Sequence, residues 1–234
     1  KIPARFDFPK PVNLIKTLLA AHYDKDALVL DFFSGSATTA EAVFNQNLID
    51  GGKRRFILVQ LPEETQDGEY KTICEIGKER IRRAGAKIKE EAGLTAQGLD
   101  IGFRVLKCDT SNMKDVYYRP DEVTQMTIGD YASNIKDDRT PEDLLFQVML
   151  DLGILLSSKI EETTIAGCKV FNVADGFLYA CFDSNVSDEV VTAIANEQPY
   201  YAVFRDSGMA SDSVLTNFDQ IFAAISPSTV RKVL

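Results

Sequence analysis

The sequence of 234 residues is poor in the residues from which metal centres and cysteine-based active sites are built. It has one histidine, His22, and four widely spaced cysteines with no Cys-x-x-Cys pair: Cys74, Cys108, Cys168 and Cys181. This pattern argues against a zinc site and against Cys/His catalysis. It predicts that the cysteines are buried free thiols.

Long apolar runs are lacking as well. The sequence contains no stretch of about eighteen apolar residues and no basic segment followed by an apolar one, so we expect neither a membrane span nor a signal peptide. We therefore expect a cytoplasmic protein. The composition, 45% hydrophobic and 26% charged, is typical of a globular chain with one large or two small domains.

Charge is unevenly distributed along the chain. Residues 1–91 carry 15 Lys and Arg against 14 Asp and Glu, a net charge of +1, and because the whole chain carries −9, residues 92–234 carry −10. An acidic field repels phosphate, so we do not expect the second part to bind DNA. Its partners are expected to be proteins.

The most informative stretch runs from Val29 to Ala40. An apolar run ends at Asp31, a turn of small residues follows around Gly35, and residues 39–44 have the spacing and composition of a helix. In such a unit the turn can approach a ligand closely and the start of the helix offers free N–H groups. Asp31 stands at the carboxyl end of the strand, where ligands bind in open α/β sheets. The sequence therefore predicts a ligand-binding turn.

Apolar patterns on both sides extend this unit. Pro11 suits the first turn of a helix whose apolar side carries residues 12, 14, 15, 18 and 19. Residues 56–61 form an apolar run short enough for a buried parallel strand, and residues 69–91 have the pattern of a long helix with a charged outer face. Many nucleoside-binding folds place an acidic residue at the end of the second strand; here that position holds Gln60, with Glu63 or Glu64 as alternatives.

This order of motifs resembles the cofactor-binding half of the β-class DNA amino-methyltransferases. The whole chain resembles the C-terminal part of the modification subunit of a type III restriction–modification system, a DNA adenine N6-methyltransferase. The resemblance implies that S-adenosylmethionine is the cofactor and that a Lys-Pro element and the Asp-Phe-Phe-Ser-Gly-Ser turn bind it. The implied cofactor-binding residues are Lys10, Pro11, Asp31, Phe32, Phe33, Ser34, Gly35, Ser36, Ala37, Thr38 and Gln60. Most of the family has a second glycine where this chain has Ala37, and alanine suits the turn if its φ is below zero.

The resemblance also indicates what the chain lacks. In the family an Asp/Asn-Pro-Pro-Tyr loop acts on the flipped base, and this loop and the target-recognition region precede the Lys-Pro element. No two of the eight prolines are adjacent and the first residue is not methionine. We therefore expect a fragment without a catalytic loop that does not methylate DNA alone. Double-stranded DNA would be bound through the missing N-terminal part, and a second modification subunit and the restriction subunit would be partners.

The second part of the sequence reads as a separate α+β domain. Residues 102–106 suggest a strand and residues 113–131 an irregular connection. Thr140, Pro141 and Asp143 signal the start of a helix that ends at Gly153. A hairpin with an Asp-Gly turn, a helix, a strand and a final helix follow; the predicted ranges are 169–182, 186–196, 200–204 and 213–224. Three aspartates at element ends are expected to be turn and cap residues: Asp183, Asp206 and Asp212.

Together these patterns predict an α/β fold with a partial Rossmann-like methyltransferase sheet, followed by a smaller two-layer α+β domain. The predicted divisions are a cofactor-binding part at 1–95, a connecting segment at 96–138 and a C-terminal assembly or interaction domain at 139–234. Two alternatives remain open. The second part could be an assembly module for subunit contacts, and the first could be a nicotinamide-dependent oxidoreductase domain, although the missing third glycine and the Lys-Pro segment argue against the latter.

Overall fold

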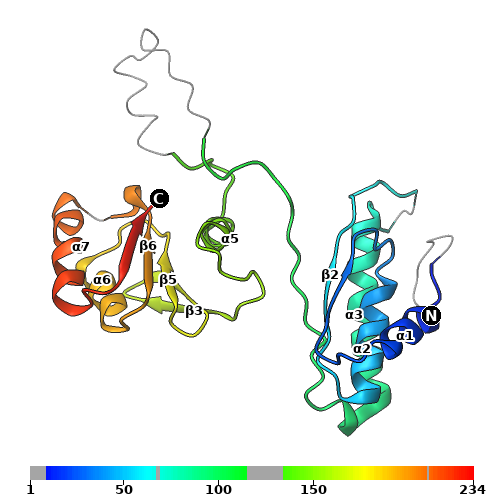
Figure 1. Ribbon diagram of the computed structural model, residues 1–234. Coiled ribbons are helices and arrows are strands. Elements are labelled where there is room, and N and C mark those ends of the chain that lie inside the picture. The colour runs from blue at the N-terminus through cyan, green and yellow to red at the C-terminus, as the bar shows by residue number, and fades with distance from the viewer. Residues whose placement is uncertain (1–8, 67–68, 115–133, 210) are drawn as a thin grey trace. The chain divides into compact units, whose positions relative to one another are not determined.

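The computed structural model describes residues 9–66, 69–114, 134–209 and 211–234. The chain divides into two compact units, Lys1–Arg104 and Val105–Leu234 (Figure 1). Most of the irregular connection predicted over 113–131 lies outside the described residues. The chain is mixed α/β, and each unit has its own sheet.

The first unit is a parallel pair of strands with helices against one face. Its elements are α1 (Val12–Ala21), β1 (Leu28–Asp31), α2 (Thr38–Asp50), β2 (Arg55–Leu58), α3 (Ile73–Ala92) and the short 3₁₀-helix η1 (Gly93–Ala96). β1 pairs with β2 in parallel, from Leu28 opposite Arg55 to Asp31 opposite Leu58. The strand–turn–helix predicted around Asp31 is thus confirmed. The long helix begins at Ile73 rather than Glu69 because the Thr72 side chain caps it by accepting the Glu75 N–H.

Alternate residues of β1 and β2 face the helices. Val29 and Phe56 pack against Leu19, Ala42 and Val43 of α1 and α2, and Leu58 packs in a second cluster with residues of α2 and α3. The opposite face is apolar and exposed; it consists of Leu28, Leu30, Ile57 and Val59. The parallel strand predicted at 56–61 is found at Arg55–Leu58, but the prediction that it is buried is wrong, because no described segment covers this face. We call these four residues the outer face.

The strand predicted at 102–106 is not formed. Residues Leu99, Ile101 and Phe103 alternate inward and pack on the first unit without β-pairing. Gly85 of α3 permits this close approach, since a Cβ at that position would lie 3.0 Å from the Cβ of Ile101. Tertiary packing of the chain on α3 thus takes the place of a strand.

The second unit contains a five-stranded mixed sheet. Its elements are α5 (Pro141–Asp151), β3 (Ile160–Ile165), β4 (Cys168–Val173), β5 (Leu178–Cys181), α6 (Asp188–Asn196), β6 (Tyr201–Phe204), η2 (Asp206–Gly208), α7 (Asp212–Ile225) and β7 (Val230–Val233). The strand order is β3-β4-β5-β6-β7. β3, β4 and β5 are antiparallel neighbours, whereas β5, β6 and β7 are parallel and joined through α6 and α7.

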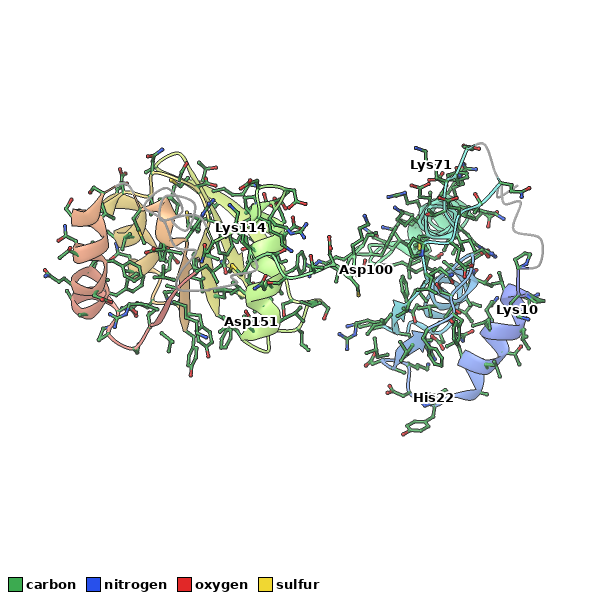
Figure 2. The ribbon with its side chains drawn as sticks, turned by 90° about the horizontal axis from the view of Figure 1, so that it is seen from above. Lys10, His22, Lys71, Asp100, Lys114 and Asp151 are labelled. Carbon is green, nitrogen blue, oxygen red and sulfur yellow. The ribbon has the colours of Figure 1, made fainter. Side chains whose placement is uncertain are left out.

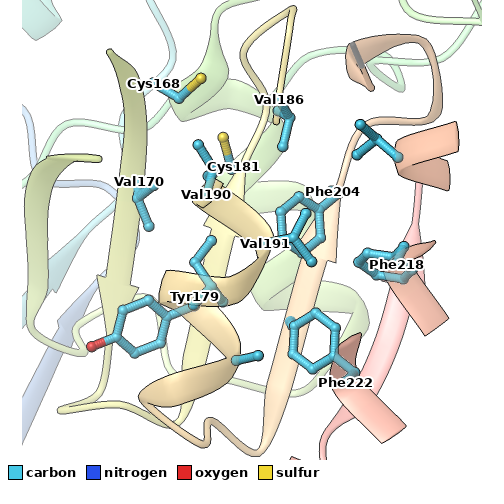
Figure 3. Packing of buried hydrophobic residues seen from close by; sticks show 14 residues of the cluster. Cys168, Val170, Tyr179, Cys181, Val186, Val190, Val191, Phe204, Phe218 and Phe222 are labelled. Carbon is cyan, nitrogen blue, oxygen red and sulfur yellow. The ribbon is translucent and has the colours of Figure 1, made fainter. Parts of the chain in front are cut away.

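Helices cover both faces of this sheet. On one face Val170, Tyr179, Cys181 and Phe204 pack against α6 and α7 (Figure 3). On the other, Phe171, Leu178, Ala180 and Val203 pack against Leu144, Leu145, Val148 and Met149 of α5. The two-layer arrangement predicted for this part is therefore wrong: there are three layers, because β4, β5 and β6 carry buried apolar side chains on both faces of the sheet.

Local signals in the second unit proved reliable. Thr140 and Asp143 form a complete capping box at the start of α5, with Pro141 in its first turn. The hairpin of β4 and β5 turns through Asp175 and Gly176, both at positive φ. The edge strands β3 and β7 were not predicted. Their sequences lack a clear apolar pattern because charged residues interrupt it: Glu161 and Glu162 on β3, and Arg231 and Lys232 on β7. Charged residues are common on edge strands.

The cysteines are free, as predicted, but not all are buried. Cys168 and Cys181 are buried, Cys74 is partly buried and Cys108 is exposed, so the prediction is wrong for Cys108. Burial raises the pKa of the Cys181 thiol to about 12. This thiol is therefore protonated at neutral pH and unsuited to nucleophilic chemistry.

Candidate functional site

Asp31 closes the turn between β1 and α2. Its Oδ1 accepts a hydrogen bond from the backbone N–H of Phe33 at 3.2 Å, and its Oδ2 accepts one from the Thr39 hydroxyl at 2.5 Å. The first bond tightens the turn and the second joins the end of the strand to the first turn of the helix. One carboxylate thus fixes both ends of the predicted ligand-binding segment.

The backbone of the turn is anchored to the segment that follows β2. Val59 N–H donates to Asp31 O at 2.8 Å, and Ser34 N–H donates to Val59 O at 3.2 Å. Within the turn, Ala37 N–H donates to Ser34 O at 2.8 Å. These bonds hold the turn at the carboxyl end of both parallel strands, the edge at which open α/β sheets bind ligands.

Gln60 contacts the turn directly. Its Oε1 accepts the Gly35 N–H at 2.8 Å, and its Nε2 donates to Leu61 O at 3.2 Å. Both ends of the amide are therefore engaged within the protein. The alternatives for a ribose contact, Glu63 and Glu64, are exposed.

Ala37 adopts a left-handed conformation, with φ 62° and ψ 36°. The condition under which alanine would suit the turn, a φ below zero, is therefore not met; the turn has the geometry that a glycine would adopt freely. Gly77 of α3 lies opposite, since a Cβ at that position would be 3.5 Å from both the Ala37 Cβ and Gly35 O. These are ordinary van der Waals distances, so α3 packs directly against the turn at Gly77.

The predicted cofactor-binding residues of the turn differ sharply in exposure. Phe32 and Phe33 are 62% and 83% exposed, with ring centroids 5.1 Å apart, whereas Ser36 is only 2% exposed and Ala37 and Thr38 are buried. A ligand can therefore reach the aromatic side chains at the start of the turn. The buried residues act on a ligand through the backbone that they shape.

Lys10 lies just before the start of α1 (Figure 2). Pro11 is the N-cap residue of this helix, and α1 packs on α2 through Leu19 and Val43. Lys10 is exposed, and its ammonium group has no hydrogen-bond or ion-pair partner among the described residues. The structure thus brings together Asp31, the turn and Gln60, while Lys10 makes no hydrogen bond or ion pair with them.

A buried arginine that the sequence analysis missed stands behind the turn. Arg80 of α3 is 7% exposed. Its Nη1 donates to Ser36 Oγ at 2.8 Å, its Nε donates to Glu41 Oε2 at 3.0 Å, and its Nη2 lies 2.9 Å from the same oxygen. A signal was present in the sequence: Arg80 falls on the apolar face of its helix, three residues after Gly77 and one before Ile81.

The far end of α2 is fixed by a second buried arginine. Arg54 pairs in bidentate fashion with Asp50, each bond 3.0 Å long, and Asn47 accepts and donates hydrogen bonds with Arg54. The hydrogen bonds from the Arg54 guanidinium lower the pKa of Asp50 to about 2. Both ends of the helix that follows the turn are thus held by ion pairs.

Over the described ranges, His, Cys, Asp and Glu side chains form no group of three or more that could hold a metal ion. In the same part of the chain, every helix is too short or too polar to cross a membrane.

The sequence is similar to known DNA methylases. A family model described as DNA methylase matches residues 2–83, the part that contains the turn, Gln60 and Arg80. The Type III restriction-modification enzyme StyLTI Mod subunit of Salmonella typhimurium is 40% identical over 134 residues, 55% of this chain and 18% of the relative. The EcoP15I Mod subunit of Escherichia coli is 32% identical over 198 residues, 81% of this chain and 28% of the relative.

A type II enzyme matches a shorter stretch: the methyltransferase M.KpnI of Klebsiella pneumoniae is 47% identical over 55 residues. The chain spans less than a third of the length of these curated relatives. The match to the family covers the turn, and the longer matches extend to most of the chain. Residues 2–83 thus match the DNA methylase family, and most of the chain is similar to the modification subunits of type III restriction–modification enzymes.

Proposed function

We propose that this chain is part of a modification subunit that methylates adenine N6 in double-stranded DNA, and that the Asp31 turn binds S-adenosylmethionine. The observation that carries this proposal is the turn itself. Asp31 ties the end of a parallel strand to a helix, and two exposed aromatic rings stand beside that junction. The DNA methylase family model matches residues 2–83, which include this turn, and this match supports a methyl donor as the ligand of the turn.

The residues present fit this cofactor. No side chain of the described residues caps the N-terminus of α2, so its first N–H groups and its partial positive charge can meet the cofactor's carboxylate. The faces of Phe32 and Phe33 suit adenine stacking or contact with a cationic group. When bound, S-adenosylmethionine supplies the methyl group. The turn, held by Asp31 and Gln60, orients it.

The exposed outer face supports a larger methyltransferase domain. Parallel sheets are covered on both faces, yet four apolar side chains, those of Leu28, Leu30, Ile57 and Val59, are exposed on this one. The relatives are more than three times longer than their match to this chain. We propose that the outer face packs against another part of the complete subunit. The Pro-Pro-containing loop and the target-recognition region would belong to that other part, and so would the contacts to DNA.

A label-transfer assay tests this proposal. The chain and the complete subunit are each incubated with radiolabelled S-adenosylmethionine and mixed-sequence DNA, and cofactor binding is measured by calorimetry. We expect sequence-specific label transfer by the complete subunit and none by the chain, because rate enhancement requires both reactants to be oriented together. Transfer by the chain alone would show a catalytic site within it. A complete subunit that binds NAD instead of S-adenosylmethionine would favour the oxidoreductase alternative.

A second proposal concerns the second unit, which we infer makes subunit contacts. Residues 105–234 carry 10 Lys and Arg against 20 Asp and Glu, a net charge of −10. Phe177 and Tyr200 stack in parallel with centroids 5.1 Å apart and are both exposed, and Tyr201 packs edge-on against each ring. Exposed aromatic clusters are typical of interface anchors. The charge favours a partner with cationic side chains, which would add cation–π contacts.

The restriction subunit is the partner we expect at this aromatic cluster. Tyr200→Ala in the complete modification subunit should weaken co-sedimentation with the restriction subunit. Tyr23 of the first unit, which is 92% exposed, provides the matched control. Tyr23→Ala should leave co-sedimentation with the restriction subunit unchanged. Loss of modification-subunit dimers instead would assign the cluster to a second copy, and equal behaviour of both variants would refute the contact.

A further inference from the structure

We infer that Arg80 is a positioning residue for the cofactor: it holds Ser36 and Glu41 so that the Asp31 turn keeps its binding conformation. This inference rests on the proposed function of the turn. Arg80 comes from α3, a different element from those that form the turn, and reaches it across 44 residues of sequence. It touches the inner side of the turn, whereas Phe32 and Phe33 are on the exposed side.

A buried arginine at position 80 is not explained by the stability of the fold alone. Removing a guanidinium and a carboxylate from water is costly, and apolar side chains of similar volume often stabilise a buried site equally well or better. Arg80 and Glu41 have side-chain exposures of only 8% and 19%. A buried ion pair at such a place is better explained by the geometry that it imposes.

That geometry acts on the turn at two points. The bond to Ser36 Oγ fixes the side chain of the residue between Gly35 and Ala37, the two positions at positive φ. A left-handed alanine is strained and persists only when its surroundings enforce this conformation. Gln60 holds the Gly35 N–H from the opposite side. The two contacts together leave the turn one conformation.

Arg80 also adjusts the charge near the start of α2. Glu41 lies in the first turn of this helix, so its negative charge would oppose a carboxylate approaching the free N–H groups. The two contacts of 3.0 and 2.9 Å from Arg80 offset that charge. The ion pair therefore preserves the field that favours an anionic ligand group. Both effects act on cofactor affinity, not on the chemical step.

The test uses Arg80→Lys, Ser36→Ala and the double variant in the complete modification subunit. Lysine can keep the charge pairing with Glu41 but cannot also hold Ser36, because it lacks the planar fork. We expect each single variant to bind S-adenosylmethionine about tenfold more weakly, as for loss of a hydrogen bond to a charged group. The double variant should be little worse than either single one, because both remove the same contact. The KM for the cofactor should rise with kcat unchanged.

Arg83→Lys is the matched control. Arg83 lies on the same helix and is 39% exposed, and its partners are Glu79 and Tyr70 rather than residues of the turn. It should bind the cofactor normally. Arg80→Lys binding with unchanged affinity, or additive losses in the double variant, would refute the inference. If the unaltered complete subunit binds no S-adenosylmethionine, the proposed function fails instead. Thermal melts identify any variant that is unfolded, and Ser36→Ala, which removes one oxygen, then carries the test alone.

Discussion

The carboxylate of Asp31 and the hydroxyl of Thr39 are joined by a hydrogen bond of 2.5 Å, across eight residues of sequence. The bond connects the carboxyl end of β1 to the first turn of α2, and the same carboxylate also accepts the Phe33 N–H. The two ends of the turn therefore depend on one side chain. This dependence makes Asp31 the most direct test of the site.

Asp31→Ala should impair S-adenosylmethionine binding in the complete subunit. The loss of hydrogen bonds to a charged group costs roughly 1.5–3 kcal/mol, or about tenfold or more in affinity. Calorimetry measures the change. Asp24→Ala removes a partly exposed carboxylate that accepts a hydrogen bond from the nearby backbone N–H of Asp26, and this variant serves as the control. Equal affinities of the Asp31 variant and the unaltered subunit would show that the cofactor does not depend on this turn.

The left-handed Ala37 predicts a difference between two alanine-to-glycine substitutions. Ala37 and Ala42 are both buried, so each loses one buried methyl group, but Ala42 is in the interior of α2. Glycine costs about 1 kcal/mol in a helix interior and relieves a penalty of about 1–2 kcal/mol at positive φ. Denaturant unfolding should show Ala42→Gly to be less stable than Ala37→Gly by about 2 kcal/mol. Equal stabilities would mean that Ala37 is not strained.

Asp50 should make stability depend on pH in the acid range. Its pKa is about 2 in the folded chain against 3.8 as the usual value, so it binds fewer protons folded than unfolded. Its contribution is therefore complete above about pH 4 and is lost as the pH falls towards 2; it amounts to about 2 kcal/mol. Asp50→Asn should be less stable than the unaltered chain at pH 6 by at least this amount, with the gap narrowing by about 2 kcal/mol at pH 2. A stability difference between the two proteins that does not change with pH would show that Asp50 does not form this ion pair.

Features that depend on residues close together in the sequence were predicted, whereas contacts between residues far apart in the sequence were not. The Asp31 turn, the Thr140 capping box and the Asp175-Gly176 hairpin depend on residues a few positions apart, and all three are found. Arg80 acts on Ser36 across 44 residues: its position on the apolar face of α3 indicates a buried side chain, but no local pattern predicts which residue it contacts. The third layer of the second unit escaped prediction for the same reason, since α5 and the strands that it covers are distant in sequence.

The boundary between the two units leads to a prediction about proteolysis. Phe103 still packs on the first unit, and the guanidinium of Arg82 lies 5.7 Å from the centre of its ring. From Arg104 to Ser111 every residue is exposed and none is in a helix or strand. Few buried contacts hold such a segment, so a protease can bind it without unfolding either unit.

Trypsin should therefore cut first between Ala92 and Arg139, with Arg104 and Lys107 the expected sites among the described residues. Mass spectrometry of the earliest products identifies the cut. The basic residues of α3 provide an internal control: Arg82, Arg83, Lys87 and Lys89 are nearby in sequence but sit in a regular helix, which must unwind before cleavage. Early cuts within residues 144–225 would instead show that the second unit is not an independent domain. Because its sheet is covered by helices on both faces, we expect that part to resist.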